Sequence, residues 1–355
     1  MTKSEFIKFL SAFDLTSKRM ENLIECMEGD FRFEKLYSMN LNKIVGNVLA
    51  TKIVENADEE FFENYISELN SKNINIITRE DEEYPEKLLN IEDSPYFLFC
   101  KGDLKLLKTK TIAIVGSRSP SNYGRIVTEK FAEELSREGV TIISGLAYGV
   151  DGIAHRKTLD SFGNTIAVLG SGFDHIYPAV HTNMAEEIAE SGLLISEYRP
   201  DVQATKFSFP RRNRIVAGLS DGVLITEASA KSGTMITKDF AIDNGITVYA
   251  IPGNITSDKS AGTNEIIASM QGVCVLSPKD VLRDLGIDSK KTKKKPVQLS
   301  IEEAKIVELL SSGEKHIEFL SENVDFDIKK LNSLLTTLEI KSIIRRMPGD
   351  FYMLG

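Results

Sequence analysis

Residues 111–118 read Thr-Ile-Ala-Ile-Val-Gly-Ser-Arg, an apolar run that ends in small and polar residues. Short apolar runs between helical segments are typical of parallel strands that are buried on both faces of a sheet. The other strands that we expect are 140–144, 165–169, 193–196, 222–226 and 247–251, with helices such as 125–138 and 184–190 between them. This alternation predicts an α/β fold, a Rossmann-like, doubly wound, mostly parallel sheet with right-handed crossovers.

The segments on either side of this sheet predict further domains. Residues 1–72 carry apolar residues at helical spacing and hold nine basic and thirteen acidic residues, so we expect a small helical domain of SAM or helix-hairpin-helix type that is not the primary nucleic-acid contact. Residues 73–289 form the extended Rossmann-like domain, with extra strands near 74–77 and 96–100. Residues 290–299 predict a lysine-rich linker, and residues 300–355 a winged-helix-like domain of three helices and a hairpin.

Composition and charge narrow the classes of protein. The formal net charge of −9 argues mildly against nucleic acid as a partner, but local clusters such as Lys206 with Arg211, Arg212 and Arg214 set the field near a groove. No apolar run approaches the roughly 20 residues of a membrane span, and residues 1–15 lack the apolar core of a signal peptide. The three cysteines and four histidines match no metal spacing, so we expect a cytoplasmic protein without a metal or other cofactor.

The expected strand ends carry small and polar residues. The first strand ends in Gly116-Ser117-Arg118, the second in Ser144-Gly145, the third in Gly170-Ser171-Gly172, and Ser232-Gly233-Thr234 follows the fifth. Small residues let backbone N–H groups approach an anion, and Arg118 adds a guanidinium that suits phosphate. We therefore expect a phosphate-bearing ligand at the carboxyl ends of the strands.

Two common phosphate ligands do not fit this pattern. A dinucleotide site needs G-x-G-x-x-G after the first strand and an acidic residue at the end of the second, and neither is present. The P-loop pattern G-x-x-x-x-G-K-[ST] is also absent. Gly170-Ser171-Gly172 is a lone GxG, which is equally well explained as a tight turn.

The stretch Lys206-Phe-Ser-Phe-Pro-Arg-Arg-Asn-Arg214 interleaves basic and aromatic residues. This pattern suits single-stranded nucleic acid, because the cations meet phosphates and the rings stack on bases. Alternatively, Phe207 and Phe209 are core residues at strand spacing, and the arginines pair with acidic neighbours.

Five blocks in this region resemble the DNA-processing protein A family (DprA/Smf). They are VGSRSPSNYG at 115–124, SGLAYGVDGIAH at 144–155, TIAVLGSGFDHIYP at 165–178, FPRRNRIVAGLS at 209–220, and a run of short motifs from Glu227 to Asn264. Their order and spacing cover the whole central domain. A departure is His181, where the family often has Asn, and we attach no functional consequence to it.

The resemblance implies a protein that binds single-stranded DNA without sequence preference, protects it, and loads the RecA recombinase onto it in natural transformation. It also implies a homodimer through the Rossmann-like domain, and a single-strand-binding protein is a further candidate partner. The family's DNA-contacting positions carry over onto Gly116, Ser117, Arg118, Lys206, Phe209, Arg212, Asn213 and Arg214. Ser144, Gly145, Gly233 and Thr234 fall on the same rim, and Arg211 occupies a variable position of the Phe-Pro-x-Arg-Asn-Arg pattern.

Several residues carry alternative interpretations. Asp151 and His155 at i and i+4 are conceivable as an acid–base pair, but a structural pair that braces the loop is favoured. Glu227 would be the catalytic carboxylate of the alternative function, an enzyme that hydrolyses nucleotide N-glycosidic bonds; a bond from loop amides to Glu227 is the favoured explanation. We therefore expect a binding protein and no enzyme. Three tyrosines near loops, Tyr123, Tyr148 and Tyr177, have two open interpretations: each either stacks on a base or packs within the protein.

Overall fold

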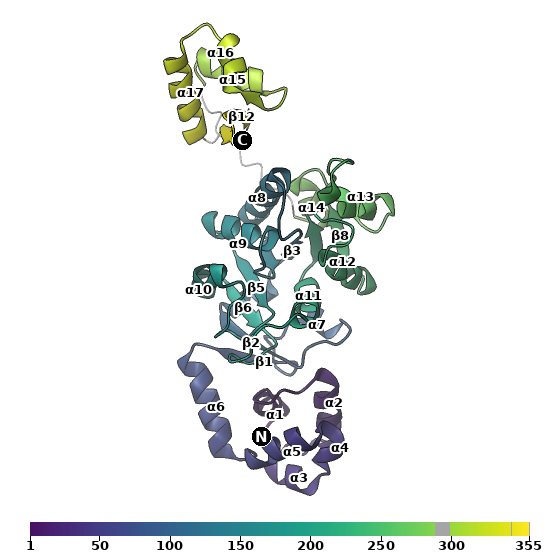
Figure 1. The fold of residues 1–355 in the computed structure, drawn as a ribbon. Helices are drawn as coiled ribbons and strands as arrows, with labels where there is room; N and C mark the ends of the chain where they lie inside the picture. Colours follow the sequence, from purple (N-terminus) through teal and green to yellow (C-terminus); the bar gives the residue numbers. More distant parts are fainter. Residues whose placement is uncertain (288–298, 342, 355) are drawn as a thin grey trace. The chain divides into compact units, whose positions relative to one another are not determined.

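The computed structural model describes residues 1–287, 299–341 and 343–354 (Figure 1). The chain divides into two units, residues 1–289 and 290–355. The predicted lysine-rich linker lies outside the described residues, except for its last residue, Leu299. Among the described residues, no helix is both long enough and apolar enough for a membrane crossing.

A sheet with the strand order β1-β2-β6-β5-β4-β3-β7-β8-β9 forms the centre of the first unit. The strands are β1 (Asn75–Thr78), β2 (Phe97–Gly102), β3 (Thr111–Val115), β4 (Thr141–Ser144), β5 (Thr165–Leu169), β6 (Leu193–Ser196), β7 (Gly222–Ile225), β8 (Thr247–Ala250) and β9 (Val273–Cys274). β3 to β9 run parallel, and β1 and β2 add an antiparallel edge. The predicted Rossmann-like, doubly wound, mostly parallel sheet is confirmed.

Helices cover both faces of this sheet (Figure 1). On one face lie α8 (Asn122–Arg137), α9 (Val150–Asp160), α10 (Thr182–Ser191) and α14 (Pro278–Asp284). On the other lie α7 (Glu86–Leu89), α11 (Ser208–Gly218), α12 (Thr234–Asp243) and α13 (Ala261–Ala268). Short 3-10 turns are η1 (Leu104–Lys108), η2 (Ala179–His181) and η3 (Asp258–Ser260). Alternation along β3 sends Ile112 and Ile114 toward α8, and Ala113 and Val115 toward α11.

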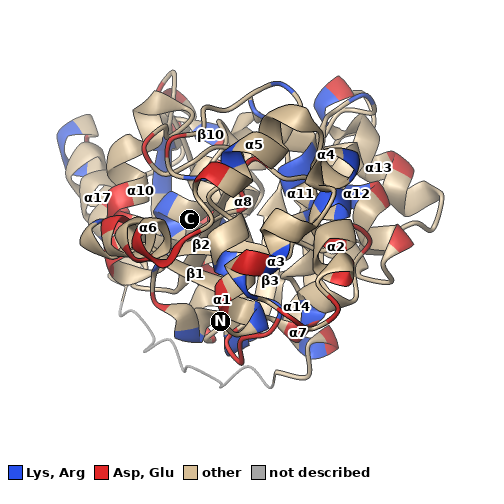
Figure 2. Cartoon of the chain, turned by 90° about the horizontal axis from the view of Figure 1, so that it is seen from below, with Lys and Arg blue, Asp and Glu red and all other residues tan. Residues whose placement is uncertain are grey.

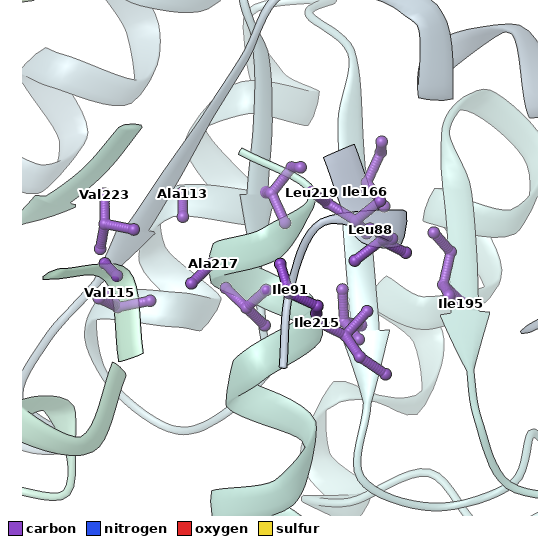
Figure 3. Packing of buried hydrophobic residues seen from close by; sticks show 14 of the residues in the cluster. Leu88, Ile91, Ala113, Val115, Ile166, Ile195, Ile215, Ala217, Leu219 and Val223 are labelled. Carbon is purple, nitrogen blue, oxygen red and sulfur yellow. The ribbon is translucent and has the colours of Figure 1, made fainter. Parts of the chain in front are cut away.

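The core on the second face fixes α11 (Figure 3). Ile215, Ala217 and Leu219 pack against strand residues such as Ala113 and Ile166. Burying an isoleucine or leucine side chain contributes about 1.5–3 kcal/mol to the free energy of unfolding. This packing anchors the helix whose amino-terminal end carries the basic–aromatic stretch.

The N-terminal helices form a layer at the antiparallel edge of the sheet. They are α1 (Lys3–Leu10), α2 (Ser17–Cys26), α3 (Phe33–Ser38), α4 (Leu41–Val45), α5 (Asn47–Glu55) and α6 (Glu59–Ser71). Their apolar side chains share one core with Ile76 of β1 and Phe97 and Phe99 of β2. The small helical region is thus present, and a domain boundary between residues 72 and 73 stays a prediction.

The second unit combines three helices with a small sheet. Its elements are α15 (Ile301–Leu310), β10 (Lys315–His316), α16 (Ile317–Glu322), α17 (Ile328–Ile340), β11 (Ile344–Met347) and β12 (Phe351–Leu354). The sheet order is β10-β12-β11, as in a winged helix with its hairpin. The second helix, which the sequence predicts near residues 314–322, begins at Ile317, because residues 315–316 pair with β12 instead.

Candidate nucleic-acid interface

The candidate interface lies where the sheet reverses its winding direction. β3 and β7 are parallel neighbours, but the chain leaves β3 for α8 on one face and β7 for α12 on the other. The two connections therefore diverge beyond the carboxyl ends of these strands. Ligands of doubly wound sheets bind at such a switch point.

Gly116, Ser117 and Arg118 begin the loop after β3. The Ser117 N–H donates to the Glu227 carbonyl oxygen at 2.7 Å, and a Cβ on Gly116 would lie 2.7 Å from that oxygen. The loop therefore packs tightly against the end of β7, and only a glycine fits at its first position. Arg118 is exposed, with its Cζ 5.8 Å from the centre of the Phe209 ring.

Ser144 and Gly145, at the end of β4, are buried. The Ser144 hydroxyl donates to the Ile114 carbonyl oxygen at 2.6 Å. A Cβ on Gly145 would lie 1.4 Å from Nη1 of Arg212, so the guanidinium occupies the space above the glycine. These two residues hold the loop from beneath, and the structure gives them no open face.

The basic–aromatic stretch is the start of a helix. Lys206 and Phe207 precede α11, and both are exposed, Phe207 by 74%. The alternative that placed Phe207 and Phe209 in a strand is wrong, because Ser208–Gly218 is helical, and Pro210 is tolerated in its first turn. The Phe209 ring is half-buried and lies 5.2 Å from the Tyr177 ring.

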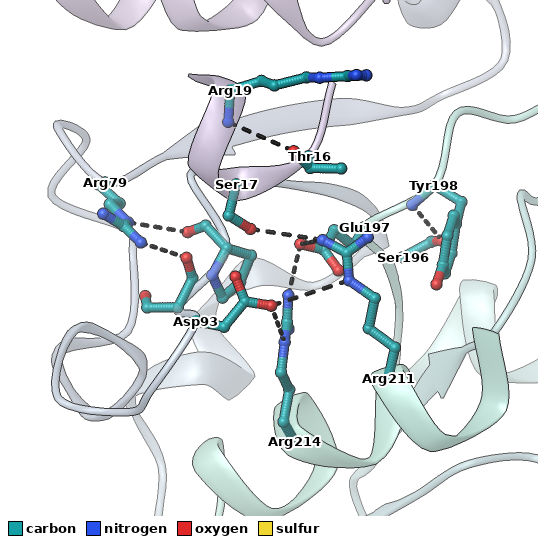
Figure 4. A network of polar contacts seen from close by, with 12 residues as sticks. Thr16, Ser17, Arg19, Arg79, Asp93, Ser196, Glu197, Tyr198, Arg211 and Arg214 are labelled. Atoms are coloured by element: carbon teal, nitrogen blue, oxygen red, sulfur yellow. Dashed lines mark hydrogen bonds and ion pairs between the residues drawn. The ribbon is translucent and has the colours of Figure 1, made fainter. Parts of the chain in front are cut away.

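The arginines of α11 point in different directions. Arg211 and Arg214 share Glu197, at 3.4 and 2.6 Å, and both also reach Asp93 (Figure 4). Arg212 is buried, and its Nη1 donates to the Val168 carbonyl oxygen at 2.8 Å. Figure 2 colours α11 among the basic segments, but this charge is largely engaged by protein groups.

The remaining predicted residues lie at or near the carboxyl ends of the parallel strands. Asn213 is half-buried in α11. Gly233 is exposed, and a Cβ there would meet nothing within 4 Å. Thr234 starts α12, and its buried N–H donates to the Ser232 hydroxyl at 3.2 Å. Gly233 thus has the space for a close approach by a ligand.

The candidate acid–base residues, Asp151 and His155, form hydrogen bonds within the fold. Asp151 accepts from the Gly145 N–H at 3.1 Å, and burial raises the pKa of its carboxyl while the charge of Arg212 opposes the rise. Burial lowers the pKa of the His155 imidazole to about 3, so the ring is neutral at physiological pH, and its Nδ1 lies 2.7 Å from the Thr165 hydroxyl. Asp151 thus braces the loop after β4, whereas His155 connects α9 to the first residue of β5.

Glu227 is also committed to the fold. Its carboxylate is buried and accepts from the Ser121 N–H at 2.7 Å and from the Ser121 hydroxyl at 2.5 Å. Ser121 in turn caps α8. This geometry favours the structural explanation of Glu227 and gives the hydrolase alternative no free carboxylate at this position.

Sequence reasoning missed Asp93, Glu197 and His181. Glu197 directly follows β6, and an acidic residue at a strand end was a usable signal. Asp93 lies 121 residues before Arg214, and no local pattern could have paired them. His181 donates from Nδ1 to the Leu146 carbonyl oxygen at 2.8 Å and so holds the loop after β4.

The sheet order, the switch point and the glycine-bearing strand ends define a Rossmann-like α/β protein. A family model described as DNA recombination-mediator protein A matches residues 75–286, and the chain belongs to this family. It is 35% identical over 255 residues to DNA processing protein DprA of Bacillus subtilis, an alignment that covers 70% of this chain and 85% of that protein. It is 41% identical over 218 residues to protein Smf of Escherichia coli, covering 61% and 58%.

Two solved structures share this fold. The X-ray structure of DNA processing protein A from Streptococcus pneumoniae matches with a TM-score of 0.66 at 34% identity, over 80% of this chain and 99% of that one. DNA processing protein A from Helicobacter pylori, whose structure concerns its single-stranded DNA binding mode, matches with a TM-score of 0.55 at 36% identity, over 59% of this chain and 95% of that one.

Proposed function

We propose that this chain binds single-stranded DNA across the carboxyl ends of its parallel strands, without sequence preference and without breaking a bond. The observation that carries the proposal is the state of two cations. Arg118 and Lys206 are exposed, and within the described residues no carboxylate pairs with either, whereas Arg211 and Arg214 are engaged in ion pairs. Arg118 lies 5.8 Å from the centre of the Phe209 ring and Lys206 lies 5.0 Å from the centre of the Phe207 ring, so each unneutralised cation has an aromatic face for a base close to it.

The predicted residues take two roles in this proposal. Contacts with the DNA backbone and bases come from the accessible residues of the edge, which are Gly116, Ser117, Arg118, Lys206, Phe209 and Gly233. Support from beneath comes from the buried or paired residues, which are Ser144, Gly145, Arg211, Arg212, Arg214 and Thr234. Asn213 remains a candidate contact. The negative net charge of the chain is compatible with this role, because the phosphates respond mainly to the charges close to the binding surface.

The proposal extends to the place of the protein in recombination. Family membership supports a mediator that hands single-stranded DNA to the RecA recombinase in the cytoplasm, protects the strand, and acts as a homodimer in natural transformation. We do not propose that the second unit binds the single-stranded DNA. Residues 299–355 hold seven basic and ten acidic residues, and an acidic balance disfavours a primary DNA contact.

Fluorescence anisotropy with labelled oligonucleotides tests the proposal. We expect single-stranded oligo-dT to bind more tightly than a duplex of equal length, and affinity to fall as salt rises, because each phosphate contact releases a counterion. Longer oligonucleotides should bind more tightly than short ones. Equal or tighter binding of the duplex would refute the proposal.

A further inference from the structure

Tyr148 is an exposed ring on a rigid loop. The loop 145–149 joins β4 to α9, and Tyr148 is 46% exposed between the buried Leu146 and the tightly packed Gly149. Leu146 and Gly149 have φ values of +55° and +75°. A Cβ on Gly149 would lie 2.3 Å from the Ser117 carbonyl oxygen and 2.6 Å from the Arg118 carbonyl carbon. The backbone beside Tyr148 therefore lies directly against the Arg118 loop.

His181 fixes this loop from the other side. Besides the bond from its Nδ1 to the Leu146 carbonyl oxygen, its ring lies over Gly152, where a Cβ would come within 2.6 Å of Cε1. The His181 and Tyr148 ring centres are 5.9 Å apart at an interplanar angle of 56°. The histidine thus supports both the backbone and the ring of the loop.

A comparison with Tyr123 shows that Tyr148 is not tied down by its hydroxyl. The two rings are equally exposed, at 45% and 46%. The Tyr123 hydroxyl donates to the Pro252 carbonyl oxygen at 2.7 Å, whereas the Tyr148 hydroxyl has no hydrogen bond to any described residue. Tyr148 therefore presents an exposed ring whose hydroxyl group forms no hydrogen bond with a described residue.

We propose that Tyr148, positioned by His181, forms a second base-stacking site that takes an unpaired nucleobase of the strand whose phosphate lies at Arg118. This inference rests on the proposed function. The Arg118 side chain lies 5.8 Å from the Phe209 ring, and the Arg118 backbone abuts the loop that carries Tyr148, so Phe209 and the Tyr148 loop both adjoin one phosphate-binding position. Every base has a π-face, so stacking of this kind is tolerant of sequence.

The absence of tryptophan from the sequence gives a direct test. Tyr148→Trp introduces a single tryptophan fluorophore, and we expect oligo-dT to quench it by about half or more at saturation. An oligonucleotide with abasic sites throughout its length should bind with little quenching. Tyr123→Trp is the matched control, and its emission should change little. Anisotropy on the same samples reports binding independently.

Affinity and rescue measurements complete the test. Tyr148→Ala should weaken binding of oligo-dT by about tenfold, within the range for one stacked base, and leave binding of the abasic strand unchanged. In the Tyr148→Trp background, His181→Ala should reduce quenching, and His181→Asn, whose amide can also donate to the Leu146 carbonyl oxygen, should restore it.

The outcomes separate the two proposals. Binding of oligo-dT without quenching of the tryptophan in the Tyr148→Trp variant, or equal losses of affinity for the normal and abasic strands in Tyr148→Ala, would overturn the stacking site and leave the proposed function standing. No binding by anisotropy in the unaltered protein would overturn the proposed function itself.

Discussion

Replacing Arg118 and Lys206 together by alanine is expected to weaken binding of single-stranded DNA by about a hundredfold at low salt, since each lost phosphate contact costs roughly tenfold. Both cations are exposed and no described carboxylate pairs with either, so the double variant removes two unneutralised positive charges from the proposed contact surface. The loss should be the same for all sequences, because phosphate contacts read no bases. Anisotropy titrations at several salt concentrations should also show a slope shallower by about 1.4, or 0.7 for each single-strand phosphate contact.

A matched control removes two cations that lie at the amino ends of the parallel strands, away from the proposed contact surface. Lys105 and Lys108 are exposed in η1, ahead of the amino end of β3. Lys105→Ala combined with Lys108→Ala changes the net charge by the same amount and should alter affinity less than twofold. If the control pair weakened binding as much as the Arg118 and Lys206 pair, the field of the whole protein and not the strand-end edge would govern binding.

Arg212→Met is expected to lower the free energy of unfolding by about 3–5 kcal/mol, the usual cost of removing one partner from a buried set of charges. The guanidinium fills the space above Gly145 and donates to Val168, and its charge opposes the rise in the Asp151 pKa. Methionine leaves the carboxyl without this support. Chemical denaturation followed by circular dichroism measures the change.

Two further variants test the cause of this loss. Arg211→Met removes a half-exposed arginine one position earlier and should cost only about 1 kcal/mol, as is usual for partly exposed ion pairs. Asp151→Asn added to Arg212→Met should recover part of the stability, because the uncompensated carboxyl is then gone. A single variant Arg212→Met within 1 kcal/mol of the unaltered protein would show that the buried guanidinium does not hold the loop.

The parallel strands were predictable because their signal is local. The ranges 111–115, 165–169 and 193–196 match β3, β5 and β6 to the residue, and the other three predicted strands differ by one residue at one end. An apolar run closed by glycine or serine marks such a strand wherever the sheet is buried on both faces. The rules of doubly wound sheets predicted a mostly parallel sheet with right-handed crossovers, whereas the order of its strands became known only from the structure.

The basic–aromatic stretch was harder to predict, because its residues are sorted by distant partners. The sequence shows four cations between 206 and 214, but helical geometry turns Arg212 inward and directs Arg211 and Arg214 to Asp93 and Glu197. No local pattern identifies those carboxylates as partners. The role of His181 was missed for the same reason, since the carbonyl that it binds lies 35 residues earlier.

Photo-cross-linking tests the central claim most directly. Single-stranded oligonucleotides that contain 5-bromodeoxyuridine can be cross-linked to the full chain and the attached peptides identified by mass spectrometry. The account predicts cross-links in residues 116–119 and 146–149, which follow β3 and β4, and in residues 205–209, which lead into α11 and place Phe209 next to Gly170 at the end of β5. Cross-links confined to residues 290–355, with these three loops unmodified, would contradict it.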